Sequence, residues 1–353
     1  MSDSDARIDW YRSPIDRSKL AELTKRNNWR PLLQNVAMLG FSAVTGAIAV
    51  WAFHNLAWPW IVITCYFHCT FFGYFGGGAG GHKLSHKNMF RSAWLNEFSI
   101  RFSGFFTWFD FHFFRTSHAQ HHQYTVHHDL DLEVMLPLGL KWHQWIWSVT
   151  LHPTGFVREI RKLAARLLPA GGKSYRKQWA VRGFSEGDPE YRAGFRWIRF
   201  VFLGHVALGT VSVLSGNWIL LILVTFAGFL ANWHKGLTHM PQHFGMRPDV
   251  ADWRQSTRTY LAGPMVQFFY WNMNYHVEHH MYAAVPFYNL PKLRKAIEND
   301  LPEATRGLLC HLERDVTSTH PHQREPKLLC AAEISGERDS RAGHDIVQTS
   351  HRR

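Results

Sequence analysis

Three short histidine clusters are the residues of this chain best suited to chemistry. Their segments are "HKLSH", "HAQHH" and "HVEHH", and the last two share the spacing i, i+3, i+4. Positions three and four apart lie on one face of a helix, so each cluster can direct its imidazoles at one point. This recurrence predicts that the clustered residues are metal ligands. They are His82, His86, His118, His121, His122, His276, His279 and His280.

The number of imidazoles indicates two metal ions. Neutral imidazole suits zinc, copper, iron and nickel, so the ligand type alone does not choose the metal. A structural zinc site is closed by about four ligands, whereas two nitrogen-rich, incomplete shells leave positions open for a small molecule. That arrangement favours redox chemistry with dioxygen at two iron ions. The Glu and Glu-x-x-His pattern of soluble di-iron bundles is absent from the sequence.

Two long uncharged runs must position these clusters. No Asp, Glu, Lys or Arg occurs from Pro31 to Gly81, or from Phe200 to His234. A helix needs roughly 20 apolar residues to cross the hydrocarbon, so each run fits two spans joined by a tight turn. Buried helices of a large soluble core are the alternative, but uncharged runs of this length are rare in soluble domains. The predicted spans are 32–53, 57–79, 196–214 and 217–234.

The basic residues predict how the spans are oriented. The two predicted turns carry no Lys or Arg, while the segment between the hairpins is rich in both. Positive charge marks the cytoplasmic side, so both termini and the histidine clusters are expected there, on a bacterial inner membrane. The net charge of +12 suits anionic lipid head groups or an acidic protein partner. Nucleic acid is not expected as a partner, since no recognition motif accompanies the charge.

The predicted fold is an all-α integral membrane protein with four transmembrane helices in two hairpins. A cytoplasmic helical cap carries the histidine-rich site for two metals. Residues 1–30 are expected to form a polar arm, 31–314 the membrane domain, and 315–353 a disordered tail poor in apolar residues. The four cysteines form no CxxC pair and are expected to be reduced and not ligands.

Two other classes of metal protein are alternatives to this interpretation. A membrane haem protein would place its histidine pairs within the spans, whereas these clusters follow the spans. A histidine-rich metal transporter would need polar or charged ligands inside the membrane, and the two uncharged runs contain almost none.

The clusters and their surroundings resemble the membrane fatty acid desaturase and hydroxylase superfamily. The resemblance covers about residues 30 to 300 and rests on three histidine boxes in the order typical of that family. Thr125, Asp129 and Asp131 in "HHQYTVHHDLDLE" are similar to the family's Thr and Asp-x-Asp, and Asn274 precedes the third box. The first box departs from the family pattern, because lysines flank it in "GHKLSHKN". Its three-residue spacer is similar to that of acyl-lipid desaturases, hydroxylases and ketolases.

The resemblance implies a ninth ligand just beyond the fourth span. The segment "WHKGLTHMPQHF" offers His234, His239 and His243 there. His239 matches the family position best, and His243 is the reserve. Residues that support the ligating imidazoles are expected among His234, Asp129, Asp131, Asn274 and Glu278.

The resemblance implies an oxygen-dependent di-iron enzyme that introduces a double bond into a lipid acyl chain. Electrons are expected from a separate ferredoxin or b-type cytochrome, since no cytochrome domain is fused to the chain. A hydroxylase or other oxygenase of a lipid or small apolar substrate is the alternative within the superfamily. Trp253, Arg254 and Arg258 are candidates for a surface that holds the head group and the donor, although a solvated basic loop fits the same residues.

Overall fold

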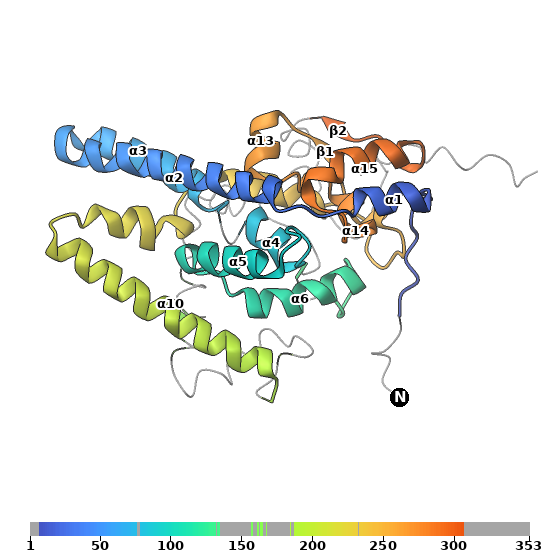
Figure 1. The fold of residues 1–353 in the computed structure, drawn as a ribbon, viewed down its shortest axis with the longest axis horizontal. Coiled ribbons are helices and arrows are strands. Elements are labelled where there is room, and N and C mark those ends of the chain that lie inside the picture. Colours follow the sequence, from blue (N-terminus) through green and yellow to red (C-terminus); the bar gives the residue numbers. More distant parts are fainter. Residues whose placement is uncertain are drawn as a thin grey trace, which may run out of the picture.

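The computed structural model describes residues 7–75, 78–131, 133–134, 184, 187–231 and 233–306, with a few single positions between 157 and 167. This part of the chain is mostly helical (Figure 1). The predicted tail, 315–353, lies outside the described residues, as does most of the basic segment between the hairpins. The helices up to residue 124 are α1 (Arg17–Leu23), α2 (Trp29–Asn55), α3 (Trp58–Phe72), α4 (Ala79–Ser85), α5 (Ala93–Thr107) and α6 (Phe111–Tyr124). The later elements are α10 (Pro189–Leu214), the π-helix η2 (Leu221–Thr225), the 3₁₀ helices η3 (Ala227–Phe229), η4 (Met240–Gln242), η5 (Phe287–Asn289) and η6 (Glu298–Asp300), α11 (Trp233–His239), α12 (Trp253–Ser256), α13 (Pro264–Phe269), α14 (His276–Met281), α15 (Leu290–Ile297), and the strands β1 (Tyr260–Leu261) and β2 (Thr305–Arg306).

The first hairpin consists of α2 and α3, which run side by side (Figure 1). A proline in the first turn of α3 favours the start of a helix, because its fixed φ angle suits that position. The Oγ1 atom of Thr45 on α2 lies 2.8 Å from Nδ1 of His68 on α3. The other ring nitrogen of His68 bonds the carbonyl of Leu223, 2.8 Å away. One buried imidazole thereby joins this hairpin to the second.

The second hairpin consists of α10 and the segment that returns beside it through η2 and η3 (Figure 1). Ile219 and Leu223 on the returning segment pack against Ala49 and Cys65 of the first hairpin. Cys65 and Cys69 are buried free thiols, as expected for reduced cysteines. The two hairpins therefore share one apolar core at this end of the molecule.

The prediction of four spans is confirmed in part. Among the described residues, α2 with 27 residues and α10 with 26 are long and apolar enough to cross a membrane. The α3 helix has 15 residues and ends at Gly73. The predicted span 217–234 is divided between a π-helix, a 3₁₀ turn and the start of α11. An uncharged run reveals apolar surroundings, but it does not reveal where the backbone changes direction inside them.

The cap is built from short helices around an aromatic core. The helices α4, α5 and α6 lie below the inner end of α2 in Figure 1, and α14 and α15 lie to the right of α4. Tyr74, Tyr270 and Trp271 are completely buried in the aromatic core with Leu84 of α4 and Ile100 of α5, while residues of α14 and α15 pack in a second cluster with Leu23 of α1. A two-residue parallel pairing of β1 with β2 connects the segment before α14 to residues 305–306.

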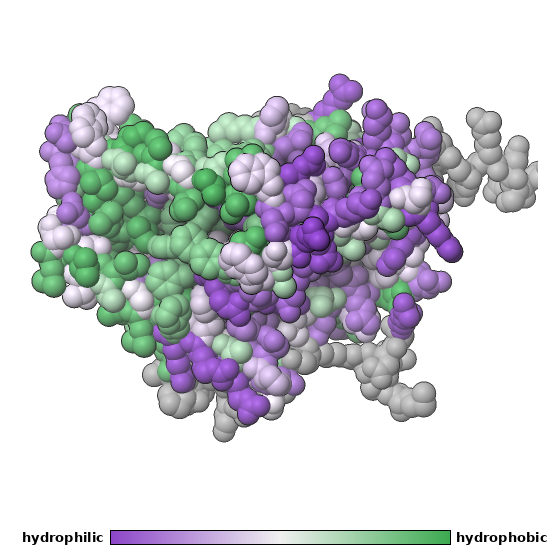
Figure 2. All heavy atoms as spheres, in the orientation of Figure 1, coloured by the Kyte–Doolittle hydropathy of each residue, from purple (hydrophilic) through white to green (hydrophobic). Residues whose placement is uncertain are grey.

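The surface is divided into an apolar end and a polar end. Hydrophobic residues cover the hairpin end on the left of Figure 2, while hydrophilic residues cover the cap on the right. Large apolar side chains face outward at the hairpin end, among them Trp58 at 74% exposure and Leu214 at 82%. Apolar surface of this extent requires a nonpolar surrounding, and exposed tryptophans are typical of the membrane–water boundary.

Candidate metal centre

Three short helices of the cap carry the histidine clusters. The α6 helix begins at Phe111 because the carboxylate of Asp110 accepts a hydrogen bond from the backbone N–H of Phe113 (3.1 Å), which caps its first turn. The α4 helix is held against α5 by the side chain of Asn96, which donates to the carbonyl of Leu84 (2.8 Å). The α14 helix is a single buried segment of six residues. Each element turns its histidines toward the middle of the cap.

Nine histidines meet there in two compact groups. The candidate ligand nitrogens within each group all lie within 4.8 Å of one another. The first group consists of His82, His86, His118, His122 and His279. The second group consists of His121, His243, His276 and His280. The groups are adjacent, since the rings of His122 and His280 stack with centroids 4.3 Å apart.

The Nε2 atoms converge at the centre of each group. In the first group, Nε2 of His118 lies 3.1 Å from Nε2 of both His86 and His122. In the second group, Nε2 of His276 lies 2.9 Å from that of His243 and 3.1 Å from that of His280. Several lone-pair-bearing nitrogens facing one point form the donor set of a metal site.

In the first group, a carboxylate and the buried Lys83 amine hold the outer nitrogens of two rings. Nδ1 of His118 lies 3.0 Å from a carboxylate oxygen of Glu133. Nδ1 of His279 lies 2.8 Å from the amine of Lys83. Burial keeps the pKa of the Lys83 amine well below its usual range, which favours the neutral amine beside the His279 ring. A proton fixed on Nδ1 leaves Nε2 free to bind a metal ion.

The second group is supported in the same way. Nδ1 of His121 lies 2.9 Å from Asp131, and Nδ1 of His243 donates to the carbonyl of Ser256 (3.1 Å). Nδ1 of His280 lies 3.3 Å from the hydroxyl of Thr125. Each contact fixes the ring orientation and places the proton away from the metal side. The geometry therefore presents Nε2 lone pairs in both groups.

Burial keeps most of these imidazoles neutral. It lowers the pKa of His82, His86, His122, His276, His279 and His280 well below the usual range. Burial also lowers the pKa of His243 to about 3. His121 is different: burial opposes its charged form, but the carboxylates of Asp131 and Glu133 outweigh this effect and raise its pKa. Neutral imidazole is the form that binds metal.

The structure brings His243, the reserve candidate for the ninth ligand, into the second group, whereas His239 belongs to neither group. His239 is the last residue of α11, and its ring packs against Tyr270 with centroids 4.8 Å apart. The 3₁₀ turn η4 follows directly and reorients the chain. His243 caps this turn, and its ring faces His121 and His276.

The other expected supporting residues have different roles. His234 bonds the hydroxyl of Tyr74 (2.6 Å) and belongs to neither group. Asp129 is exposed. The buried Glu278 accepts hydrogen bonds from Thr259 and Arg294, not from an imidazole. Asn274 donates to the carbonyl of Tyr260 and so anchors the loop before α14. Only Asp131 among the expected residues touches a grouped histidine.

Three supporting contacts were not anticipated from the sequence. Glu133 lies two residues beyond Asp131 and could have been found as part of the same acidic segment. Lys83 stands inside the first box, and a lysine there departs from the family pattern without indicating a contact with a ligand. Ser256 acts through its backbone carbonyl, which no side-chain pattern reveals.

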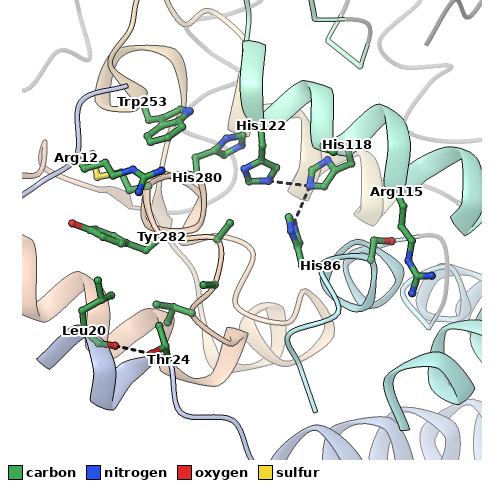
Figure 3. Close-up of a pocket in the computed structure, with 16 residues that line it drawn as sticks. Arg12, Leu20, Thr24, His86, Arg115, His118, His122, Trp253, His280 and Tyr282 are labelled. Carbon is green, nitrogen blue, oxygen red and sulfur yellow. Dashed lines mark hydrogen bonds between the residues drawn. The ribbon is translucent and has the colours of Figure 1, made fainter. Parts of the chain in front are cut away.

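A cavity of about 490 Å³ adjoins the two groups. His86, His118, His122 and His280 form one side of it (Figure 3). Arg12 and Arg115 stand at opposite ends of the same view. The remaining wall is formed by the apolar Leu20, Ala119, Trp253, Met281, Ala283, Ala284 and Val285 and by Thr24, Ser85 and Tyr282. The volume falls within the range of small-molecule sites, roughly 300–1,000 Å³.

Comparisons with known proteins show the family to which this chain belongs. The sequence model of the family described as fatty acid desaturase matches residues 58–310. This chain therefore belongs to the fatty acid desaturase family, whose members are membrane-bound oxidoreductases of lipid acyl chains. An sn-1 oleoyl-lipid 12-desaturase of Arthrospira platensis is 23% identical over 290 residues, which covers 74% of this chain and 73% of that protein.

The histidine groups fit the metal centre of this family. Nine imidazoles, divided five and four, are consistent with a di-iron site, and all but His86 and His122 are buried. Nitrogen ligands of this kind suit divalent iron, and the partners of Nδ1 supply the outer contacts that metal-bound imidazoles usually have.

Proposed function

We propose that this chain is an oxygen-dependent di-iron desaturase that introduces a double bond into a lipid acyl chain. The observation that carries the proposal is the position of two buried histidine groups beside a mainly apolar cavity. A reacting carbon chain must lie against the metals while water is excluded. The cavity offers such a place, since four of the grouped histidines form its side.

The residues proposed to hold the two ions are the nine grouped histidines, with His243 as the ninth. Iron bound there would supply the activation of dioxygen that allows hydrogen to be removed from an unactivated C–H bond. The chain's own contribution is to orient the ligating imidazoles and to exclude water. Asp131, Glu133 and Lys83 fix ring orientation through Nδ1, and burial of the groups keeps bulk water from them.

We propose lipid-linked acyl chains as the substrate class. The apolar wall of the cavity suits a methylene chain, and the relative from Arthrospira platensis is named as acting on an oleoyl lipid. The electrons would come from a separate one-electron carrier, a ferredoxin or a b-type cytochrome. Two electrons from the carrier are needed for each dioxygen that is reduced to water, because the substrate supplies the other two.

The test is the fatty acid profile of a bacterial host that expresses the chain and is supplied with oleate. Unsaturated acyl chains that are absent from the empty host are expected with the natural sequence. They are expected to vanish in His279→Ala and His276→Ala, which remove one ligand from each group. Mass spectrometry would locate the new double bond.

The same experiment separates the alternatives. Desaturation removes two hydrogens from the product, whereas hydroxylation adds one oxygen. A hydroxylated product that depends on His279 would replace the desaturase proposal by the hydroxylase. Reversible metal uptake without any oxygen consumption, in the presence of a reductant, would contradict both.

A further inference from the structure

Residues 7–16 of the N-terminal arm are held by hydrogen bonds to segments next to the metal centre. The backbone N–H of Tyr11 donates to the carbonyl of Ala251 (2.9 Å). The hydroxyl of Tyr282 beside α14 donates to the carbonyl of Ser13 (2.6 Å). The indole N–H of Trp10 donates to the carbonyl of Gln123 at the end of α6 (2.9 Å). Trp10 is thus held in one place, and its ring is partly exposed.

A stacked pair of indoles connects this arm to a ligand of the second group. The rings of Trp10 and Trp253 lie parallel, with centroids 4.6 Å apart and an interplanar angle of 2°. Trp253 is only 2% exposed, and its ring centroid lies 6.2 Å from that of His280 (Figure 3 shows Trp253 beside His280). Trp253 and His280 also contact the same hydroxyl, since the Oγ1 atom of Thr125 lies 3.3 Å from the Trp253 indole nitrogen and 3.3 Å from Nδ1 of His280.

Packed aromatic rings form an efficient route for an electron. The rate of electron transfer falls exponentially with distance and falls faster through empty space than through contacting atoms. Seven of the nine grouped histidines are buried, and His86 and His122 are only partly exposed, so a protein donor cannot pack directly on the centre. Trp10, Trp253 and His280 form a continuous series of contacts from the partly exposed arm to a residue proposed to bind metal.

The N-terminal segment that carries the outer indole is basic, and the carboxylates of Asp252 and Asp300 beside Tyr11 are paired with Arg254. Seven basic side chains of the arm and its continuation, residues 7–30, are exposed, against three exposed acidic ones. Arg12 is among them, and its guanidinium lies 5.8 Å from the centroid of the Trp253 ring. This surface belongs to the hydrophilic end of the molecule, away from the apolar hairpin tips (Figure 2). Such a surface attracts a partner of opposite charge.

We propose that an acidic one-electron carrier protein docks over the N-terminal arm and delivers electrons through Trp10 and Trp253 to the metal centre. The inference rests on the proposed function. In each transfer the reduced carrier loses one electron and the centre gains one, and no bond to the indoles forms or breaks. Two transfers, two protons and the two hydrogens taken from the substrate reduce one dioxygen to two waters.

Docking is tested on the metal-free full chain in detergent. The probe is an oxidised, acidic [2Fe–2S] ferredoxin, and its binding is measured by calorimetry at low and high salt. The double variant Arg12→Glu with Arg17→Glu is expected to weaken binding about tenfold or more at low salt, because it reverses charge at the contact. The control Arg192→Glu with Arg196→Glu reverses two exposed charges on α10 and is expected to bind as the natural chain does.

Equal binding by both double variants overturns the docking site. So does a failure of ferredoxin to bind the natural chain. If the arm variant instead loses only its retention on vesicles containing phosphatidylglycerol, the basic surface faces the membrane, and the proposal is also overturned.

The route is tested on the iron-loaded chain by stopped-flow oxidation of reduced ferredoxin without substrate. Trp10→Leu and Trp253→Leu are expected to slow this reaction several-fold, while Trp10→Phe and Trp253→Phe, which keep an aromatic ring, restore much of it. The control Trp94→Leu changes a 68% exposed indole on α5 and is expected to have no effect. Iron content and thermal unfolding identify a variant that has merely lost its fold.

Reduction by dithionite distinguishes a failure of the electron route from a failure of the proposed function. Dithionite is expected to reduce the centre equally in all of these variants. If it does, and the tryptophan variants still oxidise ferredoxin at the natural rate, the route is wrong and the proposed function stands. If dithionite cannot reduce the centre of the iron-loaded natural chain, the proposed function is wrong, and the electron route that rests on it is wrong as well.

Discussion

His243 and His239 lie four residues apart, yet only His243 reaches a histidine group. Replacing His243 by Ala removes one of four ligands from the second group, so we expect one of two bound irons and all new unsaturation to be lost. Replacing His239 by Ala removes a ring that packs on Tyr270 and should leave both irons in place. Iron per chain, measured by plasma mass spectrometry, checks both results. Loss of iron in His239→Ala with retention in His243→Ala would restore the sequence-based assignment.

The acid dependence of metal binding should differ between the groups. Metal competes with protons for neutral imidazole, and the pKa of His121 is raised while the pKa of every first-group histidine is lowered. As the pH falls, a proton therefore occupies His121 of the second group before the first-group histidines, while the lowered pKa of His243, His276 and His280 keeps those three neutral. We expect iron to leave in two steps, the first beginning at or above the usual titration range of histidine. Iron per chain after dialysis at stepped pH values measures this.

Two variants show which histidine group releases its iron in the first step. In Asp131→Asn the carboxylate that raises the pKa of His121 is absent, so the first step should move to lower pH. In His276→Ala the second group is incomplete, and the first step should disappear. A single step in the natural chain, or a first step that survives in His276→Ala, would show that the groups do not titrate as the geometry implies.

Eight of the nine grouped histidines were predictable because they fall within short segments of helical spacing. The ninth was not, since His239 and His243 are one helical turn apart. Which of them faces inward depends on the 3₁₀ turn at Met240–Gln242. Lys83 was unpredictable for another reason: a lysine between two histidines normally suggests a solvated face, and only the packing of α4 shows its amine buried against His279.

At the scale of helices, close packing fixes how α10 meets the cap. A methyl group at Gly204 of α10 would overlap the ring of Phe105 on α5, whereas one at Gly40 of α2 would meet nothing within 4 Å. Overpacking typically costs about 1–3 kcal/mol. We therefore expect Gly204→Ala to lower the thermal transition in detergent, followed by circular dichroism. Gly40→Ala should leave it unchanged or raise it slightly, because alanine favours a helix. Equal transitions for the two variants would contradict the close approach of α5 and α10.

The sequence predicted the long helices better than the short ones. A long apolar stretch can be recognised without its contacts, as α2 and the apolar part of α10, residues 200–214, show. The α3 helix and the segment with η2 and η3 are shorter and broken, and their course depends on contacts between the hairpins such as that of His68 with Leu223. Those contacts join residues 155 positions apart in the chain, which local spacing cannot reveal.

At the scale of the whole molecule, the apolar and polar ends should lie in different surroundings. The hairpin end exposes Trp58 and Leu214, and the cap end carries the basic arm, so we propose that the tips of the hairpins face away from the cytoplasm. A cysteine introduced at the exposed Ser215, between α10 and η2, should react with an impermeant maleimide added to intact cells. A cysteine at the exposed Arg91, in the cap, should react only after lysis. Cys65 and Cys69 are buried and contribute little labelling, and Cys310→Ser and Cys330→Ser are included in both variants to remove the other two native thiols. Labelling of Arg91→Cys but not Ser215→Cys in intact cells would invert the orientation and place the metal centre on the outer face.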